Sequence, residues 1–288
     1  MDRELFSEVS CIVAQIRDQT PIKSQFTDSD IVLAYLWAVR HDRPVSWACR
    51  SRNWPLWARR RRFPSEPTMS RRLRTPSVLA LLDQIECCCQ PRATDAALII
   101  DSKPLPVGEH TKDKDAHTGY ACGVMAHGYK LHLICDPAGH VHAWSIRPMN
   151  TAEPVVACEL LEHVTVCDTW LLGDSAYDSN NLHRRASELG LQLIAPRKRP
   201  RTGLGHRSHN PSRLRSMKIT ESPNSVLYNE LRRERDCIER FFGNLTSYGG
   251  GLSPLPAWVR TLPRVRRWVQ AKLILNAIRI RQRTRLCA

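Results

Sequence analysis

Ala96-Ala97-Leu98-Ile99-Ile100-Asp101 and Leu171-Leu172-Gly173-Asp174 are the two stretches that decide the fold of this chain. Each is a short apolar run that ends in an aspartate. A continuous apolar run of this length, bounded by polar residues, is typical of a strand that is buried on both faces of a sheet. We therefore expect two central strands, each with a carboxylate at its end.

The segments around these runs predict further strands and helices of one sheet. The patterns indicate strands over 129–135, 140–146 and 191–195, and helices over 152–164, 182–189 and 230–246. The order is three strands, then helix, strand, helix, strand, helix. It is typical of an α/β sheet whose first strands form a meander and whose last strands follow crossover connections. Asp101 and Asp174 then lie at the edge of the sheet where ligands bind.

Residues 1–92 have a helical pattern instead. Helices are expected over 4–19, from Thr27 or Asp28 onward, and over 45–51. We expect Pro67 to stop one element, so that the next helix starts with three arginines on its exposed side: Arg71, Arg72 and Arg74. This order resembles a helix-turn-helix DNA reader. The alternative is a helical cap domain with an arginine-rich surface.

The charge of the chain favours a polyanionic partner. There are 43 Lys and Arg residues against 28 Asp and Glu, a net charge of +15. The basic residues cluster at 59–74, at 197–218 and after residue 239, where no acid follows. Arginine predominates, and its planar fork suits bidentate phosphate contacts, so nucleic acid is the first candidate. The alternative is that the basic runs are solvated faces that keep the protein in solution.

The sequence also limits the location of the protein. No apolar run approaches the roughly 18 to 20 residues of a membrane span. The first residues are acidic and lack the order of a secretory signal. Together with an odd number of cysteines, 11, these features favour reduced thiols in the cytoplasm and no membrane partner.

A third acid, Glu239, borders the apolar stripe of the helix expected over 230–246, and Arg235 lies one turn earlier. If that helix packs on the sheet, Glu239 joins Asp101 and Asp174. Carboxylates held together repel each other and require cations, and hard oxygen ligands favour Mg²⁺ or Mn²⁺.

With these acids in view, the chain resembles bacterial insertion-sequence DDE transposases, which share a ribonuclease-H-like catalytic core. The resemblance covers roughly residues 95–285 and rests on four motifs: Asp101-Ser102-Lys103-Pro104-Leu105-Pro106, Gly173-Asp174-Ser175-Ala176-Tyr177-Asp178, Ile194-Ala195-Pro196-Arg197-Lys198, and Arg235 with Glu239-Arg240-Phe241-Phe242-Gly243. It implies a ribonuclease-H-like mixed α/β sheet flanked by helices and preceded by an all-α N-terminal region.

The family signature around the last acid is only partly kept. Arg235 and Glu239 have the expected spacing, but Arg232 stands at a tyrosine position and Thr246 at a lysine position. In the family these outer positions contact the transposon end, so this chain departs from the family pattern at those contacts. The residues between Arg197 and Val226 leave no room for the β-rich insertion of some members, so a basic loop is expected there.

The resemblance implies a DNA transposase that cleaves transposon ends and joins the 3′-hydroxyl to target DNA, with Asp101, Asp174 and Glu239 holding two Mg²⁺ or Mn²⁺ ions. It implies a homodimer on paired ends, close to the nucleoid. The expected domains are a DNA-binding region at 1–92 and a catalytic domain with basic C-terminal helices at 93–288. A nuclease of the same fold without strand transfer, and a catalytically dead DNA-binding derivative, are the alternatives.

Several basic and aromatic residues are expected to contact DNA. The basic candidates are Arg71, Arg72, Arg74, Arg197, Lys198, Arg199, Arg235 and Arg240. Trp258 and Trp268 stand among C-terminal arginines, where they either stack on bases or pack between helices.

Overall fold

The computed structural model describes residues 2–16, 24–89, 97–108, 111–121, 123–200, 202–204, 208–222, 225–247, 252 and 255–287. The chain forms two compact units. One contains Pro91–Gly243, and the other combines Met1–Gln90 with Asn244–Ala288. The C-terminal segment thus groups with the N-terminal helices, whereas we expected it to belong to the catalytic domain.

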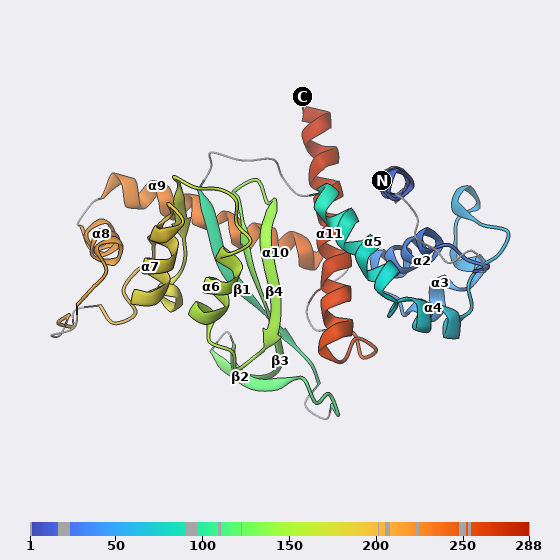
Figure 1. Cartoon of the computed structure of the whole chain (residues 1–288), viewed down its shortest axis with the longest axis horizontal. Coiled ribbons are helices and arrows are strands. Elements are labelled where there is room, and N and C mark those ends of the chain that lie inside the picture. Colours follow the sequence, from blue (N-terminus) through green and yellow to red (C-terminus); the bar gives the residue numbers. More distant parts are fainter. Residues whose placement is uncertain are drawn as a thin grey trace. The chain divides into compact units, whose positions relative to one another are not determined.

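A mixed sheet forms the centre of the first unit, which we call the sheet unit (Figure 1). Its strands are β1 (Leu98–Pro106), β2 (His117–Ala121), β3 (Val124–Cys135), β4 (Val141–Pro148), β5 (Trp170–Leu172) and β6 (Gln192–Ile194). The strand order is β2-β3-β1-β5-β6, and β4 also pairs with β3. β1, β3 and β4 are antiparallel, whereas β1, β5 and β6 are parallel. This mixed sheet with flanking helices confirms the predicted fold class.

The apolar runs of β1 and β5 are central because side chains cover them on both sides. Leu98 and Ile100 share one core with Val156 and Leu182, residues of the helices α6 (Glu153–Leu161) and α7 (Asn180–Glu188), which lie on that side of the sheet (Figure 1). Alternation along the strand turns Ile99 and Asp101 to the opposite face.

Three sequence expectations for the sheet unit were wrong. β2 was missed, because its short pattern carries exposed His117, Thr118 and Tyr120. Part of the expected basic loop is helix α8 (Pro211–Thr220), which Asn210 caps with its side chain. The single helix expected over 230–246 is two helices, α9 (Val226–Arg235) and α10 (Cys237–Ser247), with a turn at Asp236. Aspartate is unfavourable inside a helix, which is consistent with a break there.

The second unit, the helical unit, contains six helices of the described residues: α1 (Asp2–Gln15), α2 (Asp28–Arg40), α3 (Val45–Ala48), α4 (Glu66–Arg72), α5 (Pro76–Cys89) and α11 (Leu262–Cys287). Thr27 begins α2 with a complete capping box, as the sequence predicted. α11 is held to the N-terminal helices by buried polar contacts. Lys272 Nζ donates to the Val39 carbonyl at 2.9 Å and to Asp42 Oδ1 at 2.5 Å.

The arginines after Pro67 do not start a helix, so the predicted recognition helix was wrong at this point. Pro67 lies in the first turn of α4, which Ser65 caps, and Arg71 and Arg72 end that helix. Proline is favourable in the first turn, where its missing N–H has no intrahelical acceptor to lose. Arg74 lies in the turn before α5.

No helix among the described residues is both long enough and apolar enough to span a membrane. The longest of them, α11, carries basic residues along its length.

Candidate active site

The parallel pairing of β1 and β5 brings Asp101 and Asp174 to the same edge of the sheet. Ile99 pairs with Leu172, and each aspartate follows two residues later. Because side chains alternate along a strand, a two-residue step keeps both carboxylates on one face. Asp101 does not end its strand as predicted: β1 continues to Pro106 against β3, where Asp101 pairs with Leu133. Only the pairing with β5 stops before Asp101.

Asp101 is held in a position that disfavours its charge. Its carboxylate accepts the backbone N–H of Ser102 at 2.7 Å. Burial, together with the nearby Asp174 and Glu153 carboxylates, raises its pKa to about 7, although the Ser102 N–H and Arg235 oppose the shift. The charge of Asp174 is therefore close enough to act on Asp101, so two of the three predicted acids form an electrostatically coupled pair.

Asp174 lies in a tight turn directly after β5. Its Oδ1 accepts the N–H of Ala176 at 2.8 Å and begins the short helix Ser175–Tyr177. A side chain on the residue before it, Gly173, would be in tight contact with its neighbours. A Cβ there would lie 3.1 Å from Tyr177 Cβ and 3.2 Å from Ile100 Cγ2. Glycine thus lets the turn pack closely on β1, beside Asp101.

A basic cavity of about 230 Å³ adjoins Asp174. Its lining includes Asp174 and Ser175 on one side and Tyr228, Arg232 and Arg235 of α9 on the other. The positions 228, 232 and 235 are one and two turns apart, so α9 presents them on one face. An acidic edge next to two arginines suits a phosphodiester, whose negative charge requires cations around it.

Glu153 is an acid of this region that the sequence reasoning did not single out. It begins α6, and its Oε1 accepts hydrogen bonds from Ser102 Oγ at 2.8 Å and Lys130 Nζ at 3.0 Å. Although burial opposes ionisation, these bonds lower the pKa of Glu153. The sequence did place Glu153 in the first turn of a predicted helix that follows a strand, and this position was the signal that could have identified it. Glu153 keeps a negative charge near Asp101.

Glu239 lies in the first turn of α10 with its side chain exposed. Ile238 of α10 is buried, and the ring centroid of Phe242 on the same helix is 5.7 Å from Lys103 Nζ of β1. Within the described part of the chain, no group of three or more His, Cys, Asp or Glu side chains is placed to hold a metal ion. The structure thus brings together Asp101 and Asp174, while the role of Glu239 stays a prediction.

The donor set at the sheet edge fits a divalent cation. The buried carboxylate of Asp101, whose ionisation the neighbouring Asp174 makes less favourable, and the carboxylate of Asp174 supply the hard oxygen ligands that Mg²⁺ and Mn²⁺ prefer. The raised pKa of Asp101 is the observation that carries this fit, because a bound cation removes the repulsion that burial and Asp174 impose. Asp101 and Asp174 are the residues that would hold it.

The basic residues predicted to contact DNA divide into two groups. Arg71, Arg74, Lys198, Arg199 and Arg240 are exposed, and Arg235 lines the cavity beside Asp174. Arg72 and Arg197 are used within the fold. Arg72 is 8% exposed and bonds to Asp28 Oδ1 at 2.5 Å and to the Phe26 carbonyl at 3.0 Å. Arg197 forms an ion pair with Glu221 at 3.2 Å and donates to the Arg199 carbonyl.

The raised pKa of Asp101 gives a prediction for stability. The unfolded carboxyl titrates near its usual 3.8 and the folded one near 7, so the folded state binds more protons between these values and becomes less stable as the pH rises through this range. Without divalent cations, Asp101→Asn should therefore raise the melting temperature by a few degrees at pH 8 and change it little at pH 4. Thermal unfolding followed by circular dichroism measures both.

The matched control for this experiment is Asp168→Asn, the same chemical change at an exposed position of the sheet unit. Asp168 has a φ of 56°, a conformation that asparagine adopts readily, so the control should leave both melting temperatures nearly unchanged. A stabilisation by Asp101→Asn that is equal at pH 4 and pH 8 would contradict the prediction.

The chain also matches a known protein family. The family model described as "Transposase DDE domain" matches residues 92–262, more than half of the chain. A solved structure of the piggyBac transposase synaptic complex with hairpin DNA is similar at 14% identity and a TM-score of 0.48, over 95% of this chain and 71% of that chain. A simian T-cell lymphotropic virus intasome in complex with PP2A regulatory subunit B56 gamma is similar at 13% identity and a TM-score of 0.21, over 58% of this chain and 59% of that chain. No curated protein matches. Both TM-scores are below 0.5, so the family match alone bears on identity.

Proposed function

Because the chain belongs to the transposase DDE domain family, we propose that it cleaves transposon ends and joins the resulting 3′-hydroxyl to target DNA. The observation that supports the chemistry is the coupled pair of Asp101 and Asp174 beside a cavity lined by Arg232 and Arg235. Glu239 completes the proposed catalytic set, as its spacing from Arg235 in the sequence implies.

Each residue has a distinct part in the proposed reaction. Asp101 and Asp174 would hold two Mg²⁺ or Mn²⁺ ions and, with Glu239, would make the edge of the sheet the place of reaction. When bound, such ions lower the pKa of the attacking water or 3′-hydroxyl and stabilise the leaving oxygen. Arg235 contacts the phosphate near the cut, and its charge also favours the ionised form of Asp101, which is the form that binds cations.

The proposed DNA contacts outside the reaction centre come from the exposed cations: Arg71, Arg74, Lys198, Arg199 and Arg240. Arg72 and Arg197 stabilise local structure instead, through Asp28 and Glu221. Arg232 stands at the position where the family has tyrosine. Tyr228 lies one turn before it on α9 and lines the same cavity. We assign Tyr228 a contact to the transposon end, and we assign the active species as a homodimer that holds two ends.

A strand-transfer assay tests the proposal. Purified full-length chain, Mg²⁺, a labelled duplex with a pre-cut 3′-hydroxyl end and supercoiled plasmid should give labelled, nicked or linear plasmid as the joined product. The matched substrate with a 3′-dideoxy end lacks the attacking hydroxyl and should give no joined product while binding equally well.

The other outcomes identify the alternatives. Cleavage of an uncut end in Mg²⁺ or Mn²⁺, with no joining of the pre-cut end, would show a nuclease without strand transfer. Specific binding of the end without either reaction would show a catalytically dead DNA-binding derivative, with Arg232 and Thr246 as the departures to revert first.

A further inference from the structure

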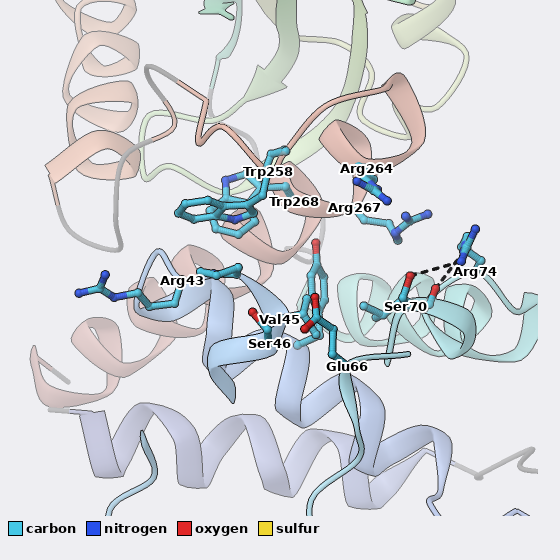
Figure 2. Close-up of a pocket in the computed structure, with 14 residues that line it drawn as sticks. Arg43, Val45, Ser46, Glu66, Ser70, Arg74, Trp258, Arg264, Arg267 and Trp268 are labelled. Carbon is cyan, nitrogen blue, oxygen red and sulfur yellow. Dashed lines mark hydrogen bonds between the residues drawn. The ribbon is translucent and has the colours of Figure 1, made fainter. Parts of the chain in front are cut away.

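The helical unit contains a cavity of about 180 Å³ that the catalytic site does not use (Figure 2). One wall comes from the segment before α11 and its first turns, with Trp258, Arg264 and Trp268. The facing wall comes from Tyr35 of α2, from residues 43–46 and from 66–74, the last two ranges belonging to α3, α4 and their flanking turns. Two parts of the chain almost 200 residues apart in sequence thus enclose one space.

The cavity is strongly basic. Four arginines line it, whereas Glu66 is the acid among its described lining residues; the arginines are Arg43, Arg74, Arg264 and Arg267. None of these four takes part in an ion pair among the described residues. Burial lowers the pKa of Arg267, and the charges of Arg264 and Arg74 lower it further, so three guanidinium groups lie close enough to repel one another. An anion in the cavity would relieve that repulsion.

The aromatic lining adds a second, independent observation. Trp258 is 41% exposed, so part of its indole is free to stack. Trp268 is 3% exposed. Trp268 thus packs within the fold, as one of the two sequence interpretations held, and Trp258 is the aromatic side chain with a free face.

We propose that this cavity binds one nucleotide, with the base stacked on Trp258 and the phosphate held by Arg264 and Arg267. Guanidinium groups bind phosphate as a fork, and stacking on an indole is available to every base. Glu66 lies on the facing wall (Figure 2) and repels phosphate, which directs the phosphate to the arginines of α11. A bare anion would use the arginines but leave Trp258 without a role. The proposal concerns the helical unit and does not depend on the catalytic acids.

Calorimetric titration of the full chain with dAMP and with inorganic phosphate tests the site. Trp258→Ala should weaken dAMP binding about tenfold, the effect of losing one stacked base, and leave phosphate binding unchanged. Arg267→Ala should weaken both ligands by about tenfold. Circular dichroism of each variant establishes that it is folded.

The chain offers a matched control for each variant. Arg266 precedes Arg267 on α11 and is exposed, but it does not line the cavity, so Arg266→Ala removes the same charge and should leave both affinities within about twofold. Trp57 is 42% exposed and also lies outside the cavity, so Trp57→Ala controls for the loss of an exposed indole. Equal losses in variant and control, or no binding of dAMP to the folded chain, would overturn the proposal.

A second arm identifies the source of the nucleotide. A duplex with one unpaired, extrahelical nucleotide is compared with the same duplex fully paired. If the unpaired nucleotide increases affinity and Trp258→Ala removes that gain, the cavity takes a nucleotide of DNA. If dAMP binds and the two duplexes bind equally, the cavity takes a free nucleotide.

Discussion

Asp174→Asn should lower divalent-dependent cleavage of end DNA by about three orders of magnitude, and Asp101→Asn should do the same. Each change removes one of two charged oxygen donors from the sheet edge while keeping the shape of the side chain. The loss corresponds to roughly 4 kcal/mol of transition-state stabilisation, within the several kcal/mol that cation binding supplies to phosphoryl transfer. Asparagine still accepts the Ala176 N–H at position 174, so the turn after β5 is kept. Single-turnover cleavage in Mg²⁺ measures the effect.

DNA affinity should change little in either variant, because exposed arginines and lysines supply most of the binding free energy. Asp168→Asn again serves as the control and should retain full cleavage. The result that would contradict the assignment is cleavage within tenfold of the unaltered chain for Asp101→Asn or Asp174→Asn. Loss of cleavage in Glu239→Gln, with binding intact, would add the third acid to the site.

Arg72→Met should destabilise the helical unit by about 3–5 kcal/mol, because it removes the guanidinium that pairs with the buried carboxylate of Asp28. Asp28 is 1% exposed and begins α2, and Arg72 also bonds to the Phe26 carbonyl. The guanidinium thus ties the end of α4 to the start of α2. Urea unfolding followed by circular dichroism should show an earlier transition for this unit.

The neighbouring Arg71 provides the control, since it is exposed on the same turn of α4. Arg71→Met should change stability by less than about 0.5 kcal/mol. Adding Asp28→Asn to Arg72→Met should recover part of the loss, because the buried charge is then gone. Equal stability of the Arg71→Met and Arg72→Met variants would show that the Asp28 contact contributes nothing.

The centre of the fold was predictable because its physical signal is strong. The apolar runs that end at Asp101 and Asp174 must be buried on both faces, and a central strand of a sheet is one of the few arrangements that buries both faces of so short a run. The parallel register of Ile99 with Leu172 then places the two aspartates together. The extent of β1 beyond Asp101 was not predictable, because Ser102, Lys103 and Pro104 carry no apolar pattern and are held by pairing with β3.

Burial of charged residues was the main feature that the sequence did not reveal. Arg71, Arg72 and Arg74 are the same residue type within four positions of the sequence. Of these three, Arg72 is the one that bonds to a buried acid, Asp28, 44 positions earlier. Glu153 of α6 likewise lies near Asp101 because it accepts hydrogen bonds from Ser102 of β1 and Lys130 of β3. Such pairs depend on tertiary contacts that no local pattern encodes.

The helical unit is interrupted in the chain by the whole sheet unit, and this sets an order for its assembly during synthesis. Residues 91–243 leave the ribosome before α11 does, so the sheet unit has all of its own segments while the helical unit lacks one of its helices. Until then, the Val39 carbonyl lacks the hydrogen bond that Lys272 donates, and Asp83 lacks the hydrogen bond that Gln270 donates at 2.7 Å. The cavity between residues 43–74 and 258–268 also has only one wall. During synthesis there is therefore an interval in which all segments of the sheet unit are present and the helical unit still lacks α11.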